Sequence, residues 1–582
     1  MSDLKQIPEN PWDIYPRPQL RRSSFSSLNG EWELQLGRDE ALPIRVPFCI
    51  ESELSGVKKT DRAGAAICYK KVFRLPEGFV KSRVLLHFGA VDQIARVVLN
   101  DRFYGSHEGG YTAFTLDVTE AVLRDGENTL LVFVEDYLPL HLLPTGKQKE
   151  KRGGMWYTPV TGIWQSVWLE SVPEKYVGAL RIRTEGPEVR IDLLKDQTSS
   201  SGTDSEEPAL LSMNGRLRYS ENGQEVTVPV RSGHAEFTVK APRFWTPEHP
   251  FLYDFTLTAG ADMVHSYFAL RDITIGEIGG IPRILLNQKP YFFHGVLDQG
   301  YFDKGIYTPE TPEAYQKDLQ LLKDCGFNML RKHIKVEPEI FYWYCDTMGI
   351  AVFQDMVNCG DYHFLRDTIL PTVTGGKLRS DARRNRNDRV RANFEKTMAE
   401  TVRQLQNHPS IVYWTIFNEG WGQFCASEMY EKLRALDDSR LIDTASGWFH
   451  VRDMKTDVES RHVYFRAAKP VKADKPYVLS EFGGYTLKIE GHVFDENKSY
   501  GYKGHHSKEE LMQNLVKLFD RDVIAAIPEG LCADIYTQLS DVEDEVNGLV
   551  TYDREVVKVD VDVMKEISFR IRQKVEELRH ER

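Results

Sequence analysis

The sequence predicts a multidomain protein in which two β-sandwiches are followed by a C-terminal (β/α)8 barrel. The chain has 582 residues, which is too long for one compact core. Short alternating runs of apolar and polar residues dominate up to about residue 276, and strands alternate with amphipathic helix-length stretches beyond it. We therefore expect domains at residues 1–174, 175–276 and 277–582.

The first two blocks consist of strand-length runs between turn signals, a pattern typical of β-sandwiches. Asn100 and Asp101 separate two of these runs, and both residue types tolerate the backbone conformation of a tight hairpin turn. The strands expected in the first block are residues 32–34, 69–75, 84–88, 95–99, 113–118, 129–134 and 165–170. Those expected in the second block are residues 178–184, 189–194, 210–219, 235–240 and 254–259.

The third block contains eight short strand candidates, the number that a (β/α)8 barrel requires. They are residues 291–296, 328–331, 350–354, 411–417, 441–445, 462–464, 477–480 and 533–537. Residues 312–325 and 391–406 carry apolar side chains at helical spacing, so we expect helices there.

Composition excludes several classes of partner. The formal net charge is −12 and there is no long basic block, which argues against a nucleic acid held through its phosphates. No apolar stretch has the length of a signal peptide core or a membrane span, so we expect no membrane partner and a cytoplasmic location. The seven cysteines lack metal-site spacing and are expected to be thiols in a reducing compartment.

Two glutamates mark the candidate active face. Asn418 and Glu419 follow expected strand four, Glu481 follows expected strand seven, and glycines come directly after both segments. The C-terminal strand ends of a barrel form its active face, so these side chains are expected to converge there. The alternative is that Asn418 or Glu419 only caps a helix beginning near Ser427. Two such strand ends favour a shared site over two independent caps.

Paired carboxylates are the groups that cleavage of a glycosidic bond needs. One donates a proton to the leaving oxygen, and the other attacks the anomeric carbon or activates water. A separation of about 5–5.5 Å leads to retention of configuration, and about 6.5–9.5 Å leads to inversion. Strands four and seven are expected to face each other across the barrel, which favours the shorter distance.

Several motifs resemble those of glycoside hydrolase family 2, which contains β-galactosidases, β-glucuronidases and β-mannosidases. NEG at 418–420 and SEFGG at 480–484 are similar to the acid/base and nucleophile motifs of that family. GGMWYTPVTGIWQSVWLE (153–170), FFHGVLDQGY (292–301) and YTQLSDVEDEVNGLVTYDR (536–554) agree, so the resemblance covers essentially the whole chain. It implies a jelly-roll sugar-binding-like domain, an immunoglobulin-like sandwich and a catalytic TIM barrel, in that order.

The resemblance also implies roles for four residues. Glu419 is similar to the general acid/base, Glu481 to the nucleophile, and Asn418 to the asparagine that binds the sugar 2-hydroxyl. Tyr464 resembles the tyrosine near the nucleophile, and its alternative is an aromatic residue that only packs at the rim.

Five further residues are candidates for substrate binding. Arg331 and His333, at the end of strand two, could lower the pKa of Glu481; structural ion pairing in the barrel is the alternative. Asp298 could bind sugar hydroxyls or could be a turn residue. Trp448 and Tyr536 are candidate stacking platforms for a sugar, or ordinary core residues. No metal or cofactor motif is present, so neither is expected.

The expected function is exo-acting hydrolysis of a terminal β-linked sugar from a small glycoside or oligosaccharide, with retention. A β-galactosidase-like activity is the first hypothesis, and a β-glucuronidase, another β-uronidase or an arabinopyranosidase is the alternative. The Asn-x-Lys motif that binds the sugar carboxylate in typical β-glucuronidases is missing after strand eight, and NQK at 287–289 is a hairpin by position. A hypothesis of another class is a non-catalytic carbohydrate-binding protein. The sequence does not fix the oligomeric state, but the resemblance allows a homo-oligomer, because members of the family often self-associate.

Overall fold

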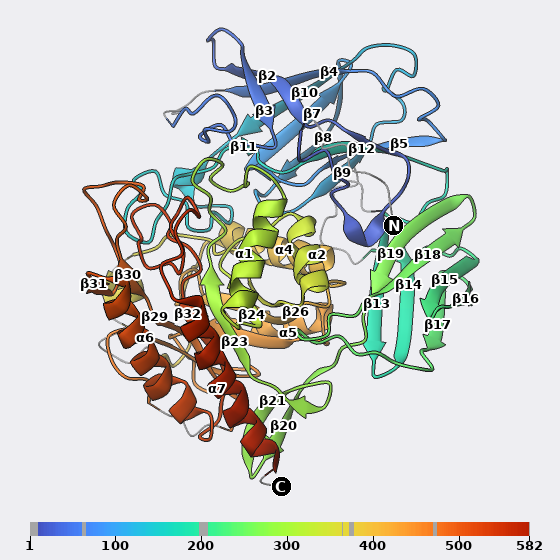
Figure 1. Ribbon diagram of the computed structural model, residues 1–582. Coiled ribbons are helices and arrows are strands. Elements are labelled where there is room, and N and C mark those ends of the chain that lie inside the picture. Colours follow the sequence, from blue (N-terminus) through green and yellow to red (C-terminus); the bar gives the residue numbers. More distant parts are fainter. Residues whose placement is uncertain are drawn as a thin grey trace.

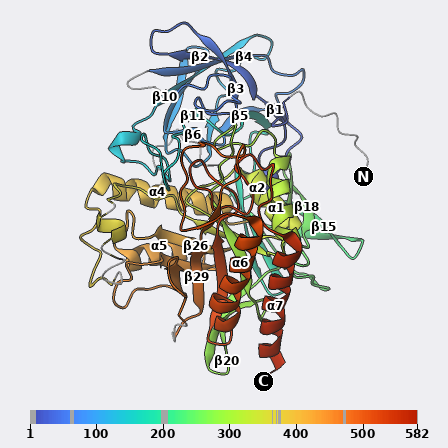
Figure 2. The same ribbon diagram turned by 60° about the vertical axis from the view of Figure 1, so that its left-hand side comes forward.

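The computed structural model describes residues 10–60, 66–196, 208–363, 365–369, 371, 377–469 and 474–580. Two β-sandwiches flank a parallel barrel (Figure 1). Figures 1 and 2 both place the first sandwich above the barrel and strand β20 below it. The predicted fold class is confirmed.

The first sandwich packs a six-stranded sheet, in the order β3-β2-β4-β10-β7-β8, against a four-stranded sheet, in the order β1-β12-β5-β9. Alternate residues of β2, among them Trp32 and Leu34, are buried between the sheets. Asn100 and Asp101 have φ of 49° and 63° and form the expected hairpin turn. The strands are β1 (Phe25–Ser27), β2 (Gly30–Leu36), β3 (Leu42–Val46), β4 (Ile67–Phe73), β5 (Arg83–Phe88), β6 (Val91–Asp92), β7 (Ile94–Leu99), β8 (Arg102–Glu108), β9 (Phe114–Asp117), β10 (Asn128–Glu135), β11 (Gly162–Ile163) and β12 (Val167–Val172).

The second sandwich packs sheet β13-β14-β17 against sheet β16-β15-β18-β19. Its strands are β13 (Ala179–Glu185), β14 (Glu188–Leu194), β15 (Gly215–Glu221), β16 (Gln224–Val230), β17 (His234–Thr238), β18 (Tyr253–Ala259) and β19 (Asp262–Phe268). A separate small sheet follows, with β20 (Ile273–Ile278), β21 (Ile281–Leu286) and β22 (Lys289–Pro290). The NQK segment forms the β21–β22 hairpin turn, as its position predicted.

The barrel consists of eight parallel strands in the order β27-β26-β25-β24-β23-β32-β29-β28. The end strands β27 and β28 contact each other, so the barrel is nearly closed. The strands are β23 (Phe293–Asp298), β24 (Met329–Lys332), β25 (Ala351–Asp355), β26 (Ile411–Asn418), β27 (Leu441–Ser446), β28 (Glu459–Val463), β29 (Tyr477–Gly483) and β32 (Leu531–Thr537). All eight expected strands are present.

Two details of the expected barrel were wrong. Strand six begins at Glu459, three residues before the expected start, because its pairing with β29 begins there, and Tyr464 follows the strand. Strands β26 and β29 do not face each other across the axis, because only β27 and β28 separate them on one side. Their C-terminal ends nevertheless lie on the same rim.

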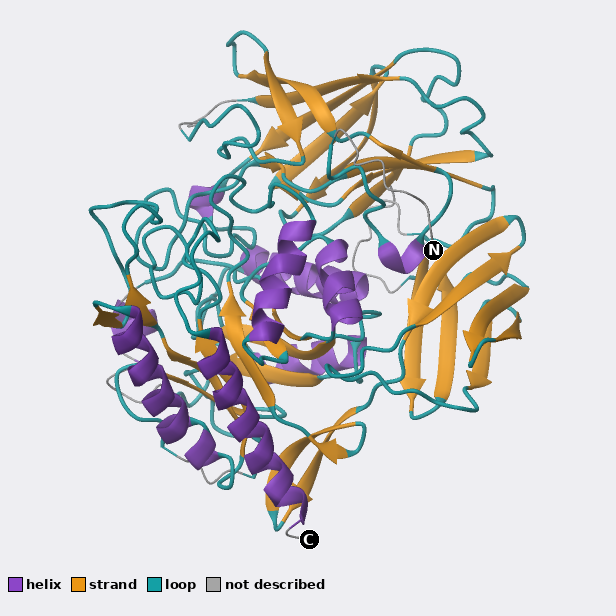
Figure 3. Cartoon of the chain, in the orientation of Figure 1, coloured by secondary structure: helices purple, strands orange, loops and turns teal. Residues whose placement is uncertain are grey.

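Helices surround the barrel strands (Figure 3). They are α1 (Glu313–Asp324), α2 (Glu339–Met348), α4 (Asp388–Leu405), α5 (Ala426–Leu436), α6 (Lys508–Asp522) and α7 (Val561–His580). Short elements are η1 (Pro18–Leu20), η2 (Leu138–Leu140), a π-helical turn η4 (Leu365–Ile369), η5 (Ile524–Ala526), β30 (Tyr485–Leu487) and β31 (Lys503–His505). Helices α1 and α4 match the two expected helices. Within the described residues, none of the helices is apolar over a length sufficient to cross a bilayer.

A buried arginine joins the two sandwiches. Arg22 Nη1 lies 2.8 Å from Glu170 Oε2 in the first sandwich, and Arg22 Nη2 lies 2.8 Å from Asp262 Oδ2 in the second. The side chains of all three residues are almost completely buried. Burial alone would raise the pKa of Glu170, but Arg17, His87 and Arg22 lower it far below its usual value.

Replacing Arg22 by Met is expected to lower the free energy of unfolding of the two packed sandwiches by about 3–5 kcal/mol. The reason is that Glu170 and Asp262 both lose a buried cation. The midpoint of urea denaturation measures this loss. The control is Arg74→Met, which breaks an exposed pair with Glu127 (Arg74 Nη2 to Glu127 Oε1, 3.3 Å) that contributes about 0–1 kcal/mol. Equal midpoints for the two variants would contradict the expectation.

Candidate active site

A tight turn presents Glu419 at the end of a buried strand. Every residue of β26 is buried, and the chain then turns through Glu419 at φ 53° and Gly420 at φ 69°. A Cβ atom on Gly420 would lie 1.9 Å from Cδ2 of Phe449, so only glycine fits beside that ring. The backbone N–H of Glu419 donates to Ser446 O at 2.9 Å, which holds the turn against the end of β27.

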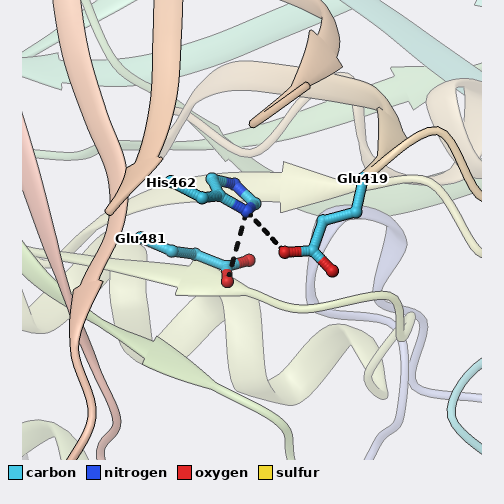
Figure 4. Close-up of side chains that lie close together, drawn as sticks. All are labelled: Glu419, His462 and Glu481. Atoms are coloured by element: carbon cyan, nitrogen blue, oxygen red, sulfur yellow. Dashed lines mark hydrogen bonds and ion pairs between the residues drawn. The ribbon is translucent and has the colours of Figure 1, made fainter. Parts of the chain in front are cut away.

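Glu481 lies within β29, close to Glu419. Its residue exposure is 4%. One carboxylate oxygen of each glutamate and a ring nitrogen of His462 all lie within 4.8 Å of one another (Figure 4). The structure therefore brings together the two carboxylates that the sequence singled out. Carboxylate oxygens this close to one another can face the same sugar ring, which the nucleophilic route requires.

His462 lies between the two carboxylates. Its Nδ1 is 2.9 Å from Glu419 Oε1 and 3.4 Å from Glu481 Oε2 (Figure 4). Its Nε2 is 3.4 Å from Arg331 Nη1 and 3.2 Å from Ser446 Oγ. Because a guanidinium group can only donate, we assign Nε2 as the acceptor and Nδ1 as the protonated nitrogen. His462 then donates its proton toward Glu419 and Glu481.

Sequence reasoning placed His462 on a strand but missed it as a site residue. A signal was available, because residues two apart in an extended segment point to the same face. Tyr464 was expected at the site, so His462 belonged on the same face of strand six. A single histidine has no motif that distinguishes this position from the barrel core.

Arg331 connects several strands beneath the carboxylates, and its exposure is 1%. Its Nε lies 2.9 Å from Asp355 Oδ1, its Nη1 lies 3.2 Å from Glu481 Oε1, and its Nη2 donates to Asn418 Oδ1 at 2.8 Å. Arg331 therefore has both of the roles considered from the sequence. It contacts Glu481, and it belongs to an ion-pair network inside the barrel.

The surroundings of Glu481 favour its ionised form. Burial alone would raise the pKa of Glu481, but the electrostatic influence of His462, Arg331 and His333, together with a hydrogen bond from Tyr464, lowers it below its usual value. The Tyr464 hydroxyl donates to Glu481 Oε2 and lies 3.1 Å from Thr537 Oγ1. Its ring also stacks on Tyr502 with a centroid distance of 3.8 Å, so Tyr464 both contacts Glu481 and packs at the rim.

His333 has no hydrogen bond to Glu481, but its electrostatic influence is among those that lower the pKa of Glu481, as expected. Its Nδ1 lies 2.8 Å from Asp355 Oδ2, and Asp355 in turn contacts Arg331. Burial lowers the pKa of His333. His333 is therefore both a partner of Asp355, which contacts Arg331, and one of the groups that favour the ionised form of Glu481.

Two expected substrate-binding residues are corrected by the structure. Asp298 is buried, with Oδ2 2.5 Å from Lys332 Nζ and Oδ1 accepting from the Gly300 N–H at 2.8 Å, so it holds the turn after β23. Tyr536 is 1% exposed, its ring packs against Phe482, and its hydroxyl accepts from a backbone N–H. Both oxygens of Asp298 and the ring of Tyr536 contact other parts of the protein. The alternatives given above, a turn residue for Asp298 and a core residue for Tyr536, describe them better.

Trp448 remains a candidate stacking platform. It is half-buried, its Nε1–H donates to Asp367 O at 3.1 Å, and its ring centroid lies 5.7 Å from that of His462.

A segment of the first sandwich reaches the barrel rim. We call residues 141–161 the arm. The ring centroid of Trp156 lies 5.1 Å from that of Trp421, two residues after Glu419. The Tyr157 hydroxyl donates to Glu545, and the Thr158 N–H donates to Glu543 Oε1 at 2.8 Å. The first sandwich therefore contributes residues to the surroundings of the carboxylates, and the sequence alone did not reveal this.

The cluster of Glu419, His462 and Glu481 has donor types and distances that suit a metal ion. The Nδ1 atom of His462 would have to be the ligand, but the hydrogen bonds of the ring place its proton on that nitrogen. The expectation that no metal is required stays a prediction.

Family models match along most of the chain. The model described as "Glycosyl hydrolases family 2, TIM barrel domain" matches residues 280–572, half of the chain. The chain belongs to glycosyl hydrolase family 2. The model for the family 2 sugar binding domain matches residues 4–173, and a third family 2 model matches residues 187–271. The resemblance noted from the motifs is thereby confirmed.

Curated relatives of this family 2 chain have two kinds of name. A β-galactosidase of Priestia megaterium is 24% identical over 80% of this chain and 45% of its own length. A β-glucuronidase of Streptococcus agalactiae is 23% identical over 70% of this chain and 68% of its own length. The matches span only 37% to 47% of the length of the first three curated relatives.

Solved structures support the fold of this family 2 chain. A β-glucuronidase of an uncultured Clostridium superposes with a TM-score of 0.71 at 19% identity, over 96% of this chain and 99% of the other. A β-galacturonidase of Eisenbergiella tayi bound to glycerol superposes with a TM-score of 0.67 at 20% identity, over 96% and 98%. At this identity the likeness shows the fold.

Proposed function

We propose that this protein is a retaining, exo-acting β-glycosidase that removes a terminal β-linked sugar from a small glycoside or oligosaccharide. The observation that carries the proposal is that one carboxylate oxygen of Glu419 lies within 4.8 Å of one carboxylate oxygen of Glu481 at the C-terminal rim of the barrel. Membership of glycosyl hydrolase family 2 supports it. The rival, a protein that binds carbohydrate without chemistry, gives no reason for two carboxylates to share one histidine proton.

The proposed reaction has two steps. In the first, the Glu481 carboxylate attacks the anomeric carbon while Glu419 gives its proton to the leaving oxygen, so the glycosidic bond breaks and a glycosyl ester forms. In the second, Glu419 takes a proton from water as the water oxygen attacks the anomeric carbon and releases the Glu481 carboxylate. Two inversions at the same carbon retain its configuration.

The neighbours of the carboxylates have positioning roles in this scheme. Arg331 and His462 keep Glu481 ionised, as a nucleophile must be. Because Arg331 Nη2 occupies Asn418 Oδ1, the NH2 group of Asn418 is left as a donor for the sugar 2-hydroxyl. That hydrogen bond would strengthen as the ring flattens toward an oxocarbenium ion.

The sugar is the finer part of the proposal. Relatives named β-galactosidase and β-glucuronidase both match this chain, so a galactoside and a uronide are the leading candidates, with an arabinopyranoside as a further alternative. We also propose a cytoplasmic location. The seven cysteines are dispersed along the chain and five of them are buried, which fits a compartment that keeps thiols reduced.

Replacing Glu481 by Gln is expected to lower kcat/KM for the best substrate in a panel of nitrophenyl β-glycosides by about 10³-fold or more, because the amide is a poor nucleophile. Glu419→Ala should accumulate the glycosyl ester, and added azide should restore turnover because it attacks without a general base. Glu431→Gln, a change on the surface of α5, is the matched control. Full activity of Glu481→Gln would refute the assignment.

Replacing His462 by Gln is expected to move the acidic limb of the kcat/KM profile to higher pH. Glu481 must be ionised in the free enzyme, and its pKa is lowered by His462 against the effect of burial. Without the histidine the pKa rises, so activity is lost at a higher pH as the solution is acidified. His265→Gln, in the second sandwich, should leave the profile unchanged. A limb that stays in place or moves to lower pH would contradict this role of His462.

A further inference from the structure

One lysine of the arm is buried beside the site and has no hydrogen-bond or ion-pair partner for its ammonium group among the described residues. Lys147 is 8% exposed. Among the residues that the structure describes, its ammonium group donates no hydrogen bond and has no carboxylate within the ion-pair distance of 4.0 Å. The other buried lysines differ. Lys332, Lys335 and Lys558 each form an ion pair at 2.5–2.9 Å.

The backbone around Lys147 is fixed against the barrel. The Thr145 N–H donates to Asn358 O at 3.2 Å, and Lys147 O accepts from the Tyr157 N–H at 3.0 Å. Gly146 has φ 61°, and a Cβ atom there would lie 2.7 Å from the Tyr111 hydroxyl and 3.0 Å from Ile334 O. Ile334 directly follows His333. Lys147 is therefore held next to the end of barrel strand β24 and is not on a free loop.

The surroundings of Lys147 belong to the candidate active site. Its Nζ lies 5.7 Å from the ring centroid of Trp156, whose ring packs on Trp421 beside Glu419. Its charge acts on two titratable groups, lowering the pKa of His333 and opposing the rise that burial causes in the pKa of Glu545. Glu545 is itself buried and accepts a hydrogen bond from the Tyr157 hydroxyl, and it forms no direct ion pair with Lys147.

The ammonium group of Lys147 has neither a hydrogen bond nor a carboxylate partner among the described residues, so it is available to bind an anionic ligand. Two carboxylates already lie at the site, and they would repel an acidic sugar unless a cation stood nearby. The NQK segment cannot supply this cation, because its hairpin lies beside β20, on the side of the barrel opposite the first sandwich (Figures 1 and 2). Arg331, the cation beside Glu481, is already bound to Asp355, Asn418 and Glu481, whereas Lys147 has no carboxylate partner among the described residues.

We propose that Lys147 binds the carboxylate of an acidic sugar, so that the preferred substrate is a β-linked uronide. This inference rests on the β-glycosidase function proposed above and names its substrate class. Lys147 is here a specificity-determining residue, since it belongs to a different domain from the two glutamates and takes no part in proton transfer or nucleophilic attack.

Lys149 provides a matched comparison. Its Nζ lies 4.9 Å from the ring centroid of the same Trp156, but its side chain is more exposed than that of Lys147. A role in stabilising the arm through contact with the Trp156 ring would apply to both lysines. A role in binding a carboxylate applies to Lys147 alone.

The test compares wild type, Lys147→Met, Lys147→Arg and Lys149→Met on the nitrophenyl β-glycosides of glucuronic acid, galacturonic acid and galactose. We expect the wild type to prefer a uronide. Lys147→Met should lower kcat/KM for that uronide by about 30-fold or more, mainly through KM, because one partner of a buried charge pair is lost. Hydrolysis of the galactoside should change by less than about 3-fold, Lys147→Arg should recover part of the uronide activity, and Lys149→Met should match wild type.

Equal losses on uronide and galactoside in Lys147→Met, or a wild type that hydrolyses the galactoside and no uronide, would overturn the inference while leaving the β-glycosidase function intact. Turnover of none of these glycosides, nor of the nitrophenyl arabinopyranoside, would instead reject the proposed function. Calorimetry with free glucuronate and galacturonate then tests Lys147 independently of turnover. Binding that Lys147→Met weakens supports the inference, and no uronate binding by the wild type overturns it.

Discussion

The arrangement of the site depends on one buried guanidinium group. Arg331 extends from β24 and contacts Asp355 on β25, Asn418 at the end of β26, His462 on β28 and Glu481 on β29. A charge at this depth is stable only when its donors are satisfied, so those strands must be in register before Arg331 can be accommodated. The position of Glu481 relative to Asn418 is thereby fixed by the closure of the barrel. A loop is not required to hold either group.

The surroundings set by Arg331 also help to give Glu419 and Glu481 different roles, although their side chains are chemically identical. Glu481 is buried and surrounded by donors from Arg331, His462 and Tyr464, so its carboxylate form is favoured. Glu419 projects from a turn after its strand and is 14% exposed, with His462 as its neighbour. One side chain is held as an anion within the sheet, and the other lies where it can exchange a proton with the substrate or with water.

Strand periodicity and glycine positions were sufficient to predict the eight barrel strands and the meeting of Glu419 with Glu481. Side-chain direction was harder to predict. Asp298 lies at a strand end, as a ligand-binding residue should, but Lys332 from the next strand takes its carboxylate, and only the register of the two strands reveals this. Tyr536 also lies at a strand end, but its ring packs against Phe482 of the neighbouring strand, which again depends on strand register. Lys147 could not have been found from sequence, because its approach to His333 depends on how two domains pack.

The arm has a consequence for how such a protein can change over evolutionary time. The groups proposed to break the bond belong to the barrel, whereas the arm that carries Lys147 is part of the first sandwich. Mutations in the arm can alter which sugars are accepted without disturbing Arg331 or the carboxylates. A change in the available glycosides would thus select for changes in one module while the proposed reaction machinery of the other is kept. Relatives that share a barrel could for this reason diverge in the glycosides that they consume.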